Sequence, residues 1–277
     1  MTFPRFAHVV NPYATEPGSA AALAQEVSLR ALRIARDCAP PGLSITLCAA
    51  VFEDDLPLVP GFFSQRTLLS RSILDLTAEH DGRRLPLLAD ILAGLSACAG
   101  AEYFIYSNID IAPMPYFYPS LAQIAARGYD AFIVTRRTIT TPFRSGADLP
   151  LMYAEIGIEH PGCDCFIFRS EWLEKFQLGR VVVGGEFVAL ALRANLEAQA
   201  QRMEIFRNLH LTFHLGDERA WLQHTADARF NEREVDGLFP RLLAGPDPSR
   251  KQALLELHAD YLKRKRRLRE RSGQGER

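Results

Sequence analysis

The chain has 277 residues, of which 48% are hydrophobic, 23% charged and 10% aromatic, as in a globular protein with one large core. The formal net charge of -1 argues against general nucleic-acid binding, which needs a basic balance. Five cysteines without a CxxC pair indicate neither a disulfide framework nor a zinc ribbon, and they favour a reducing compartment. Because the N-terminus has no signal-peptide core and no stretch approaches the roughly 18 apolar residues of a membrane span, we expect a cytosolic protein.

The first half of the chain alternates strand and helix patterns. The patterns predict, in chain order, a strand at 6–10, a helix at 19–37 with Ser19 as its N-cap, a strand at 44–52, a helical piece at 68–76, a helix at 85–100, a strand at 103–106, a helix at 118–127 and a strand at 130–135. Strand, helix and strand in this order are typical of the opening of a parallel α/β sheet.

The second half of the chain is more mixed. Its patterns predict strands at 163–168 and 180–185, a helix at 186–206, a last short strand at 210–216 and a basic helix near the end. We therefore expect an α/β fold with a Rossmann-like, mostly parallel twisted sheet flanked by helices, divided into one domain at 1–235 and a helical, basic tail at 236–277. Neither a GxGxxG fingerprint nor a P-loop is present.

The strand at 103–106 ends in Ser107-Asn108-Ile109-Asp110. In an extended backbone Asn108 and Asp110 point the same way, and two oxygen donors at a strand end can hold Mg²⁺ or Mn²⁺. The alternative is an Asx-type turn that caps the next segment.

Two later segments add candidate residues. Asp164 shares a strand face with Phe166 and Phe168, where an unpaired carboxylate is costly, so it pairs with a cation or lines a cleft. His210 and His214 point the same way in a strand, and one of them can be a ligand or a phosphate contact, although a lone histidine is usually structural.

Arginines flank the helix that leads to the Asn-Ile-Asp strand. Arg71 suits diphosphate recognition because its guanidinium pairs oxygens bidentately, whereas Arg83 and Arg84 fit solvated charges better.

With YFIYSNIDI, HPGCDCFIF and HLTFHLGD, the chain resembles a GT-A-fold, nucleotide-diphospho-sugar glycosyltransferase over about residues 5–230. The resemblance implies that Asp110 is the last aspartate of a DxD-like site and binds a divalent metal, Mn²⁺ or Mg²⁺, that bridges the donor diphosphate. Asn108 stands where the family usually has the first aspartate, so it is either a weaker ligand or a contact to the ribose or the donor sugar. His214 matches the late histidine of the metal shell, with His210 as the fallback.

The resemblance also implies the remaining roles. Asp164 is the base that takes the acceptor proton if the reaction inverts, or positions the sugar if it retains configuration. His8 or Asn11, at the end of the first strand, touches the nucleotide. The implied partners are a nucleotide-diphospho-sugar and a glycan, lipid-linked or small-molecule acceptor.

Two other functions remain open. A sugar nucleotidyltransferase usually has a glycine-rich basic loop after the first strand, where this chain has NPYATEPGSA without Lys or Arg. A catalytically degenerate protein that binds a glycan or a partner is favoured by Asn108 and by the basic tail.

The basic run Lys263 to Arg271 has two interpretations. A solvated helix end is the favoured one. The other is attraction to an acidic membrane surface, which would place the protein peripherally on the inner face of the membrane, near a lipid-linked acceptor.

Overall fold

A computed structural model describes residues 3–140, 142–216, 224–245 and 248–273. Its centre is a sheet with the strand order β3-β2-β1-β4-β7-β6-β9-β5, in which β8 also pairs with β6. The strands are β1 (Phe6–Val10), β2 (Ile45–Val51), β3 (Gln65–Leu68), β4 (Tyr103–Ser107), β5 (Ala112–Pro113), β6 (Ala131–Ile139), β7 (Ile158–Arg169), β8 (Met203–Phe206) and β9 (Thr212–Leu215).

Most strand pairs are parallel. β1 pairs in parallel with β2 and β4, and β6 pairs in parallel with β8 and β9. β7 runs antiparallel between β4 and β6, so β4 and β6 point the same way. The carboxyl ends of β1, β4, β6 and β9 therefore meet at one edge of the sheet, the edge at which α/β proteins place their ligands.

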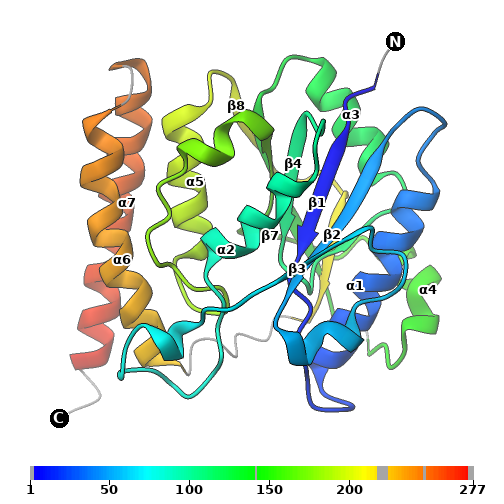
Figure 1. The fold of residues 1–277 in the computed structure, drawn as a ribbon, viewed down its shortest axis with the longest axis horizontal. Helices are drawn as coiled ribbons and strands as arrows, with labels where there is room; N and C mark the ends of the chain where they lie inside the picture. Colours follow the sequence, from blue (N-terminus) through cyan, green and yellow to red (C-terminus); the bar gives the residue numbers. More distant parts are fainter. Residues whose placement is uncertain (1–2, 141, 217–223, 246–247, 274–277) are drawn as a thin grey trace.

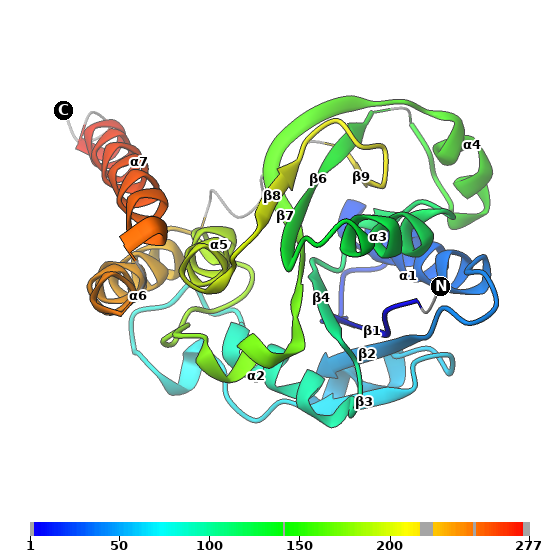
Figure 2. The same cartoon turned by 90° about the horizontal axis from the view of Figure 1, so that it is seen from above.

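Helices cover both faces of the curled sheet (Figures 1 and 2). The α-helices are α1 (Ala20–Asp37), α2 (Leu88–Ala93), α3 (Phe117–Ala126), α4 (Leu149–Ala154), α5 (Val188–Gln199), α6 (Thr225–Ala244) and α7 (Pro248–Gly273). Buried side chains of α1 and α3 form one apolar core against the sheet, and those of α2, α5, α6 and α7 form a second. In Figure 2, α6 and α7 stack outside α5, away from the strands.

The predicted start and stop signals are confirmed for two helices. The Ser19 hydroxyl accepts a hydrogen bond from the Ala22 N–H at the start of α1. Gly128 follows α3 with a φ of +85°, a left-handed conformation that a side chain disfavours.

Three predicted helices differ from the structure in type or length. Residues 68–76 form the end of β3 and a short 3-10 turn at Ile73–Asp75. The helix at 85–100 is shorter, because α2 ends at Ala93 and a 3-10 helix, η3 (Gly94–Ala97), follows. The helix at 186–206 ends at Gln199, and its last residues form β8.

The segment 180–185 is not a strand, although its valines are typical of one. Val182 makes an isolated bridge to Leu87. Its N–H donates to Asn231 Oδ1 and its carbonyl accepts from Asn231 Nδ2, each at 2.9 Å. A side chain of α6 thus satisfies the backbone groups that a neighbouring strand would otherwise bind.

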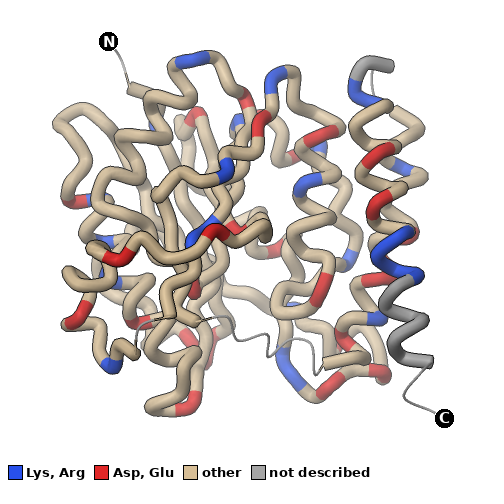
Figure 3. Tube along the Cα trace, turned by 180° about the vertical axis from the view of Figure 1, so that it is seen from behind, with Lys and Arg blue, Asp and Glu red and all other residues tan. Residues whose placement is uncertain are grey.

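The C-terminal helices pack on the body of the protein. The boundary predicted between 235 and 236 falls inside α6. Leu254, Leu257 and Tyr261 of α7 are buried in the core that includes α5. Figure 3 shows a basic stretch along α7 close to acidic segments; Lys265 lies 3.0 Å from Glu232 and is only 13% exposed.

Within the described part of the chain, no helix has the combination of length and apolar character that crossing a membrane requires.

Candidate functional site

The predicted site residues after β4 lie in a turn at the carboxyl edge of the sheet. Ile111 N–H donates to the Asn108 carbonyl at 3.1 Å, which closes a turn around Ile109 and Asp110. The backbone is therefore not extended here. The prediction that the two side chains point the same way assumed an extended backbone, so it is wrong. Asn108 turns toward β7, and Asp110 turns toward β9.

Asp110 meets His214, which β9 supplies. His214 Nε2 lies 3.2 Å from Asp110 Oδ2, while its Nδ1 lies 2.8 Å from the Gly216 carbonyl. Because a carbonyl only accepts, Nδ1 carries a proton, and the second nitrogen faces the carboxylate. The structure thus brings His214, rather than the fallback His210, to Asp110.

The pair shifts the pKa of both partners. Burial disfavours the charged imidazole, but the hydrogen bond and charge of Asp110 outweigh it and raise the pKa of His214 above its ordinary value. Burial likewise opposes ionisation of Asp110, yet His214 and the Arg136 charge keep the pKa of this carboxyl below its ordinary value. Each partner of the pair therefore favours the charged form of the other.

Asp164 lies beside this pair, on β7. Cys165 is the register partner of Ser107, so Asp164 lies next to the turn after β4. Its Oδ2 accepts from Arg136 at 2.8 Å, and both side chains are 13% exposed. Asp164 is therefore paired with a cation, as one of the two sequence interpretations required.

A β-bulge aims Arg136 at Asp164. The pairing of β6 with β7 shifts register on either side of Thr135. Such bulges redirect side chains at the ends of strands. Burial raises the pKa of Asp164, and the negative charge of Asp110 adds to this despite Arg136, so the carboxylate is a stronger base than an exposed aspartate.

Asn108 connects Asp164 to the core. Its Nδ2 donates to Asp164 Oδ1 at 3.3 Å, and its Oδ1 accepts from the Tyr106 hydroxyl at 3.2 Å. Both ends of the amide contact protein groups. These contacts let Asn108 orient Asp164, while the metal ligation expected of Asn108 from the sequence stays a prediction.

Asp110 and His214 are chemically suited to a divalent cation. Asp110 Oδ1 is a buried oxygen without a hydrogen-bond partner among the described residues, which is costly unless another group binds it. The Gly216 carbonyl fixes the imidazole so that Nε2, once deprotonated, offers a lone pair on the same side. Carboxylate and imidazole together suit Mn²⁺.

The other predicted contacts lie elsewhere. His8 is 1% exposed, with Nδ1 2.9 Å from the Tyr118 hydroxyl and Nε2 2.8 Å from the Ser107 hydroxyl. Burial lowers the pKa of His8 to about 3, so the ring is neutral and links two hydroxyl groups in the core. The structure gives no support to the predicted contact of His8 with the nucleotide. Arg71 forms an exposed ion pair with Asp90 of α2.

Asn11 remains near the edge, at the end of β1. It is 8% exposed, and its Nδ2 donates to the Ala50 carbonyl of β2 at 2.6 Å. This bond fixes the ends of two neighbouring strands. The contact with the nucleotide that the sequence predicts for Asn11 would therefore be made by its side-chain oxygen.

The sequence reasoning missed Arg136 and Tyr13. Arg136 was visible as a charged residue at a strand end, but its partner depends on the β-bulge. Tyr13 follows β1 and is 44% exposed, with its backbone held by Gln25 in two hydrogen bonds. Burial and the charge of Asp110 raise the pKa of Tyr13, while the charge of Arg83 lowers it.

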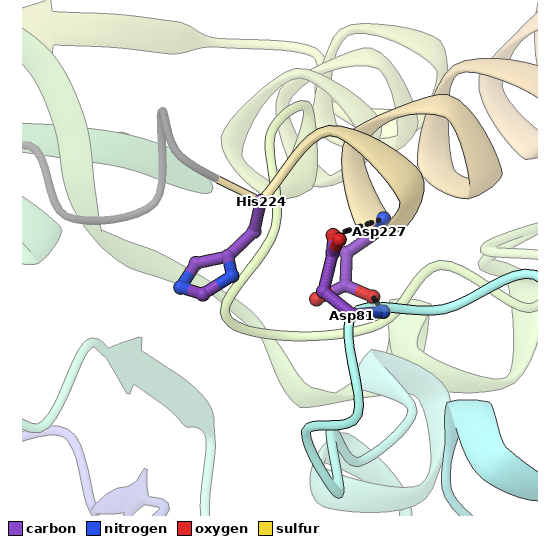
Figure 4. Close-up of side chains that lie close together, drawn as sticks. All are labelled: Asp81, His224 and Asp227. Carbon is purple, nitrogen blue, oxygen red and sulfur yellow. Dashed lines mark hydrogen bonds between the residues drawn. The ribbon is translucent and has the colours of Figure 1, made fainter.

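A second cluster of acidic side chains does not suit a metal. Asp81, His224 and Asp227 lie close together (Figure 4). Asp81 Oδ2 accepts from the backbone N–H groups of Ala226 and Asp227, in the first turn of α6.

Asp227, the central carboxylate of that cluster, has both oxygens occupied. Oδ1 accepts from the Asp81 N–H at 3.1 Å, and Oδ2 accepts from Arg83 at 2.7 Å. The guanidinium takes the place that a cation would need. The hydrogen bonds of this cluster hold α6 against the loop before α2.

Comparisons with known proteins bear on the fold. No protein-family model and no curated protein matches the sequence. Among solved structures, S. aureus TarS is similar with a TM-score of 0.55 at 11% identity, over 94% of this chain and 43% of TarS. This chain thus spans less than half of that TarS chain.

Two structures of TarS residues 1–349 are similar to the same degree. One, in complex with UDP-GlcNAc, has a TM-score of 0.55 at 10% identity and covers 93% of this chain and 71% of its own. The other covers 93% and 70%, again at 10% identity and a TM-score of 0.55. The likeness confirms the predicted GT-A-like α/β fold class.

Proposed function

We propose that this protein is a glycosyltransferase that transfers a sugar from a nucleotide-diphospho-sugar donor with the help of a divalent metal. One observation carries the proposal: Asp110 with His214 and Asp164 with Arg136 meet at the carboxyl edge of a GT-A-like sheet. The similar structure of TarS 1–349 contains UDP-GlcNAc, which supports a nucleotide sugar as the donor class.

Asp110 and His214 would hold the metal. A divalent cation bound there offsets the charge that develops on a departing nucleoside diphosphate. His214 must give up the proton on Nε2 to bind it, and the Gly216 carbonyl keeps the ring in place while it does so. Asp110 offers its unpartnered Oδ1 as the second ligand.

Asp164 would take the proton of the acceptor hydroxyl. A base works best when its pKa approaches the working pH, and burial moves Asp164 in that direction. Arg136 and Asn108 each bind one of its oxygens, which fixes the carboxylate plane. This role belongs to an inverting reaction; in a retaining one the same carboxylate positions the donor sugar.

Turnover of the donor tests the proposal. We would incubate the protein with Mn²⁺ and UDP-GlcNAc, alongside other nucleotide sugars, and measure release of the nucleoside diphosphate with water as a slow acceptor. Asp164→Asn, which keeps the shape but removes the base, should lower kcat by about 10²–10⁴-fold.

The matched control is Asp37→Asn, at the exposed end of α1, which should leave turnover unchanged. The proposal fails if no nucleotide sugar is consumed, or if Asp164→Asn retains the wild-type rate.

A further inference from the structure

Two buried cysteines on different elements lie in contact. Cys48 is on β2, and Cys98 directly follows η3. Their Sγ atoms are 3.1 Å apart, although the residues are 50 positions apart in the chain. Cys48 is 1% exposed and Cys98 8% exposed, and both lie in the core between the sheet and α2.

The two sides of this contact lie in different kinds of backbone. Cys48 is held in the sheet, with Val9 of β1 and Gln65 of β3 as its register partners. Cys98 lies in a tight connection in which Gly100 has a φ of +85°. A disulfide needs sulfurs about 2.05 Å apart, so a movement of about 1 Å closes the bond.

We propose that Cys48 and Cys98 form a reversible intrachain disulfide that cross-links β2 to the η3–β4 connection when a low-molecular-weight disulfide is in excess. The two cysteines lie in the core, and disulfide formation between them requires neither a nucleotide sugar nor a metal. It is therefore independent of the transferase proposal.

The chemistry is two successive thiol–disulfide exchanges. The Cys98 thiolate attacks a sulfur of glutathione disulfide, a mixed disulfide forms, and one glutathione thiolate leaves. The Cys48 thiolate then attacks Cys98 Sγ, the protein disulfide forms, and the second glutathione leaves. The protein thiols lose two electrons, one glutathione disulfide is reduced to two thiols, and the two protons pass to the departing glutathiones.

The order of attack follows from the environment. Cys98 is the more exposed of the two, and its hydrogen bond with Cys48 lowers the pKa of Cys98. The same hydrogen bond, together with burial, raises the pKa of Cys48. Cys98 is therefore the first nucleophile, since the thiolate is the reactive form.

The test uses the 277-residue chain carrying Cys38→Ser, which removes an exposed thiol. The folded protein is incubated with glutathione disulfide, unfolded, alkylated and analysed by peptide mass spectrometry, and Tm is measured before and after. We expect a linked pair of peptides containing Cys48 and Cys98. We also expect Tm to rise by roughly 5 °C or more and to return on reduction with dithiothreitol, because the cross-link closes a long loop.

Two variants complete the design. In Cys48→Ser, Cys98 should stop at the glutathione mixed disulfide; in Cys98→Ser, Cys48 should stay reduced. Wild-type protein, in which Cys38 reacts, shows that the oxidant is active. The inference is overturned if Cys48 and Cys98 both remain free while Cys38 reacts. It is also overturned if the linked protein has an unchanged or lower Tm, because the bond would then not fit the native fold.

Discussion

At the scale of single residues, the choice of Asn over Asp at position 108 has a physical reason. Its amide donates to Asp164 Oδ1 at 3.3 Å, a distance at which a second carboxylate would repel the first. The asparagine therefore stabilises the ionised form of Asp164. The negative charge of Asp110 disfavours the same form.

Asn108→Asp tests this reason. At neutral pH it should lower the free energy of unfolding by about 1–3 kcal/mol, because a donor is lost and two like charges face each other. Urea unfolding at several pH values measures it. Asn108→Ala, which removes the hydrogen bonds without adding charge, should be less harmful at neutral pH. Equal stability of wild type and Asn108→Asp would contradict the contact.

The Asp110–His214 pair makes stability depend on pH. Folding raises the pKa of His214 above 6.5, so its contribution is complete below that value and is lost as pH rises through the folded pKa. Folding lowers the pKa of Asp110 below 3.8, so its contribution is present above that value and is lost as pH falls through the folded pKa. The pair therefore stabilises the fold most between these two values.

Unfolding of the metal-free protein at pH values near 5.5 and near 8.5 measures this dependence. The advantage of wild type over Asp110→Asn should be about 1 kcal/mol or less at the lower pH, since Asp110 is 42% exposed, and it should shrink at the higher pH. An advantage that grows with pH would show that His214 is not protonated in the pair.

The sequence predicted which residues gather at the carboxyl edge better than it predicted their contacts. Asp110, Asp164 and His214 could be found because polar residues at the ends of apolar strands converge on one edge of a parallel sheet. The Arg136–Asp164 contact could not, because it depends on a β-bulge that has no clear sequence signal. The burial of His8 between Tyr118 and Ser107 could not be predicted, because these two hydrogen-bond partners come from other elements.

At the scale of elements, α7 is more than a solvated end. Tyr261 is 2% exposed, stacks on Phe239 of α6 and donates a hydrogen bond to Asp236 Oδ1 at 2.8 Å. Arg264 pairs with Glu186 at 3.1 Å in the turn before α5. These contacts tie α7 to α5 and α6, so part of its basic charge is already bound within the protein.

Tyr261→Ala should therefore lower the free energy of unfolding by about 3–5 kcal/mol, as large-to-small changes in cores do. Leu262→Ala, one residue on and 47% exposed, is the matched control and should change it by no more than about 0.5 kcal/mol. Chemical unfolding of both variants distinguishes them. Equal, small effects would mean that α7 is not packed as described.

Elements were predicted well where local signals and tertiary packing agreed. α1 has a capping serine and a buried stripe, and β1, β2 and β4 are apolar runs in the middle of the sheet. The run at 180–185 failed because Asn231, distant in sequence, satisfies its backbone. The helix at 186–206 failed at its end because β6 offers Met203–Phe206 a parallel partner.

At the scale of the whole molecule, large apolar cores pack on both faces of the sheet, and polar residues lie at its carboxyl edge. In the second acidic cluster, Arg83 pairs with Asp227 and ties the loop before α2 to α6. The position of Asp110, His214 and Asp164 at the carboxyl edge of the sheet agrees with one binding site there.

Metal-dependent binding of a nucleotide at that edge is the central claim. The most direct test is the thermal stabilisation of wild type, Asp110→Ala and the control Asp260→Ala by UDP, GDP, CMP and dTDP, each with and without Mn²⁺. Asp260 lies on α7 with a side chain that is 73% exposed. A ligand that binds the folded but not the unfolded protein raises Tm. The rise is roughly 5 °C or more when the ligand concentration is about 100 times Kd.

We predict that one nucleoside diphosphate stabilises wild type and Asp260→Ala only in the presence of Mn²⁺, and that Asp110→Ala loses this stabilisation. If no nucleotide raises the Tm of wild type, or if Asp110→Ala responds as wild type does, the account of the site is contradicted. The chain would then be better described as a binding protein with a GT-A-like fold.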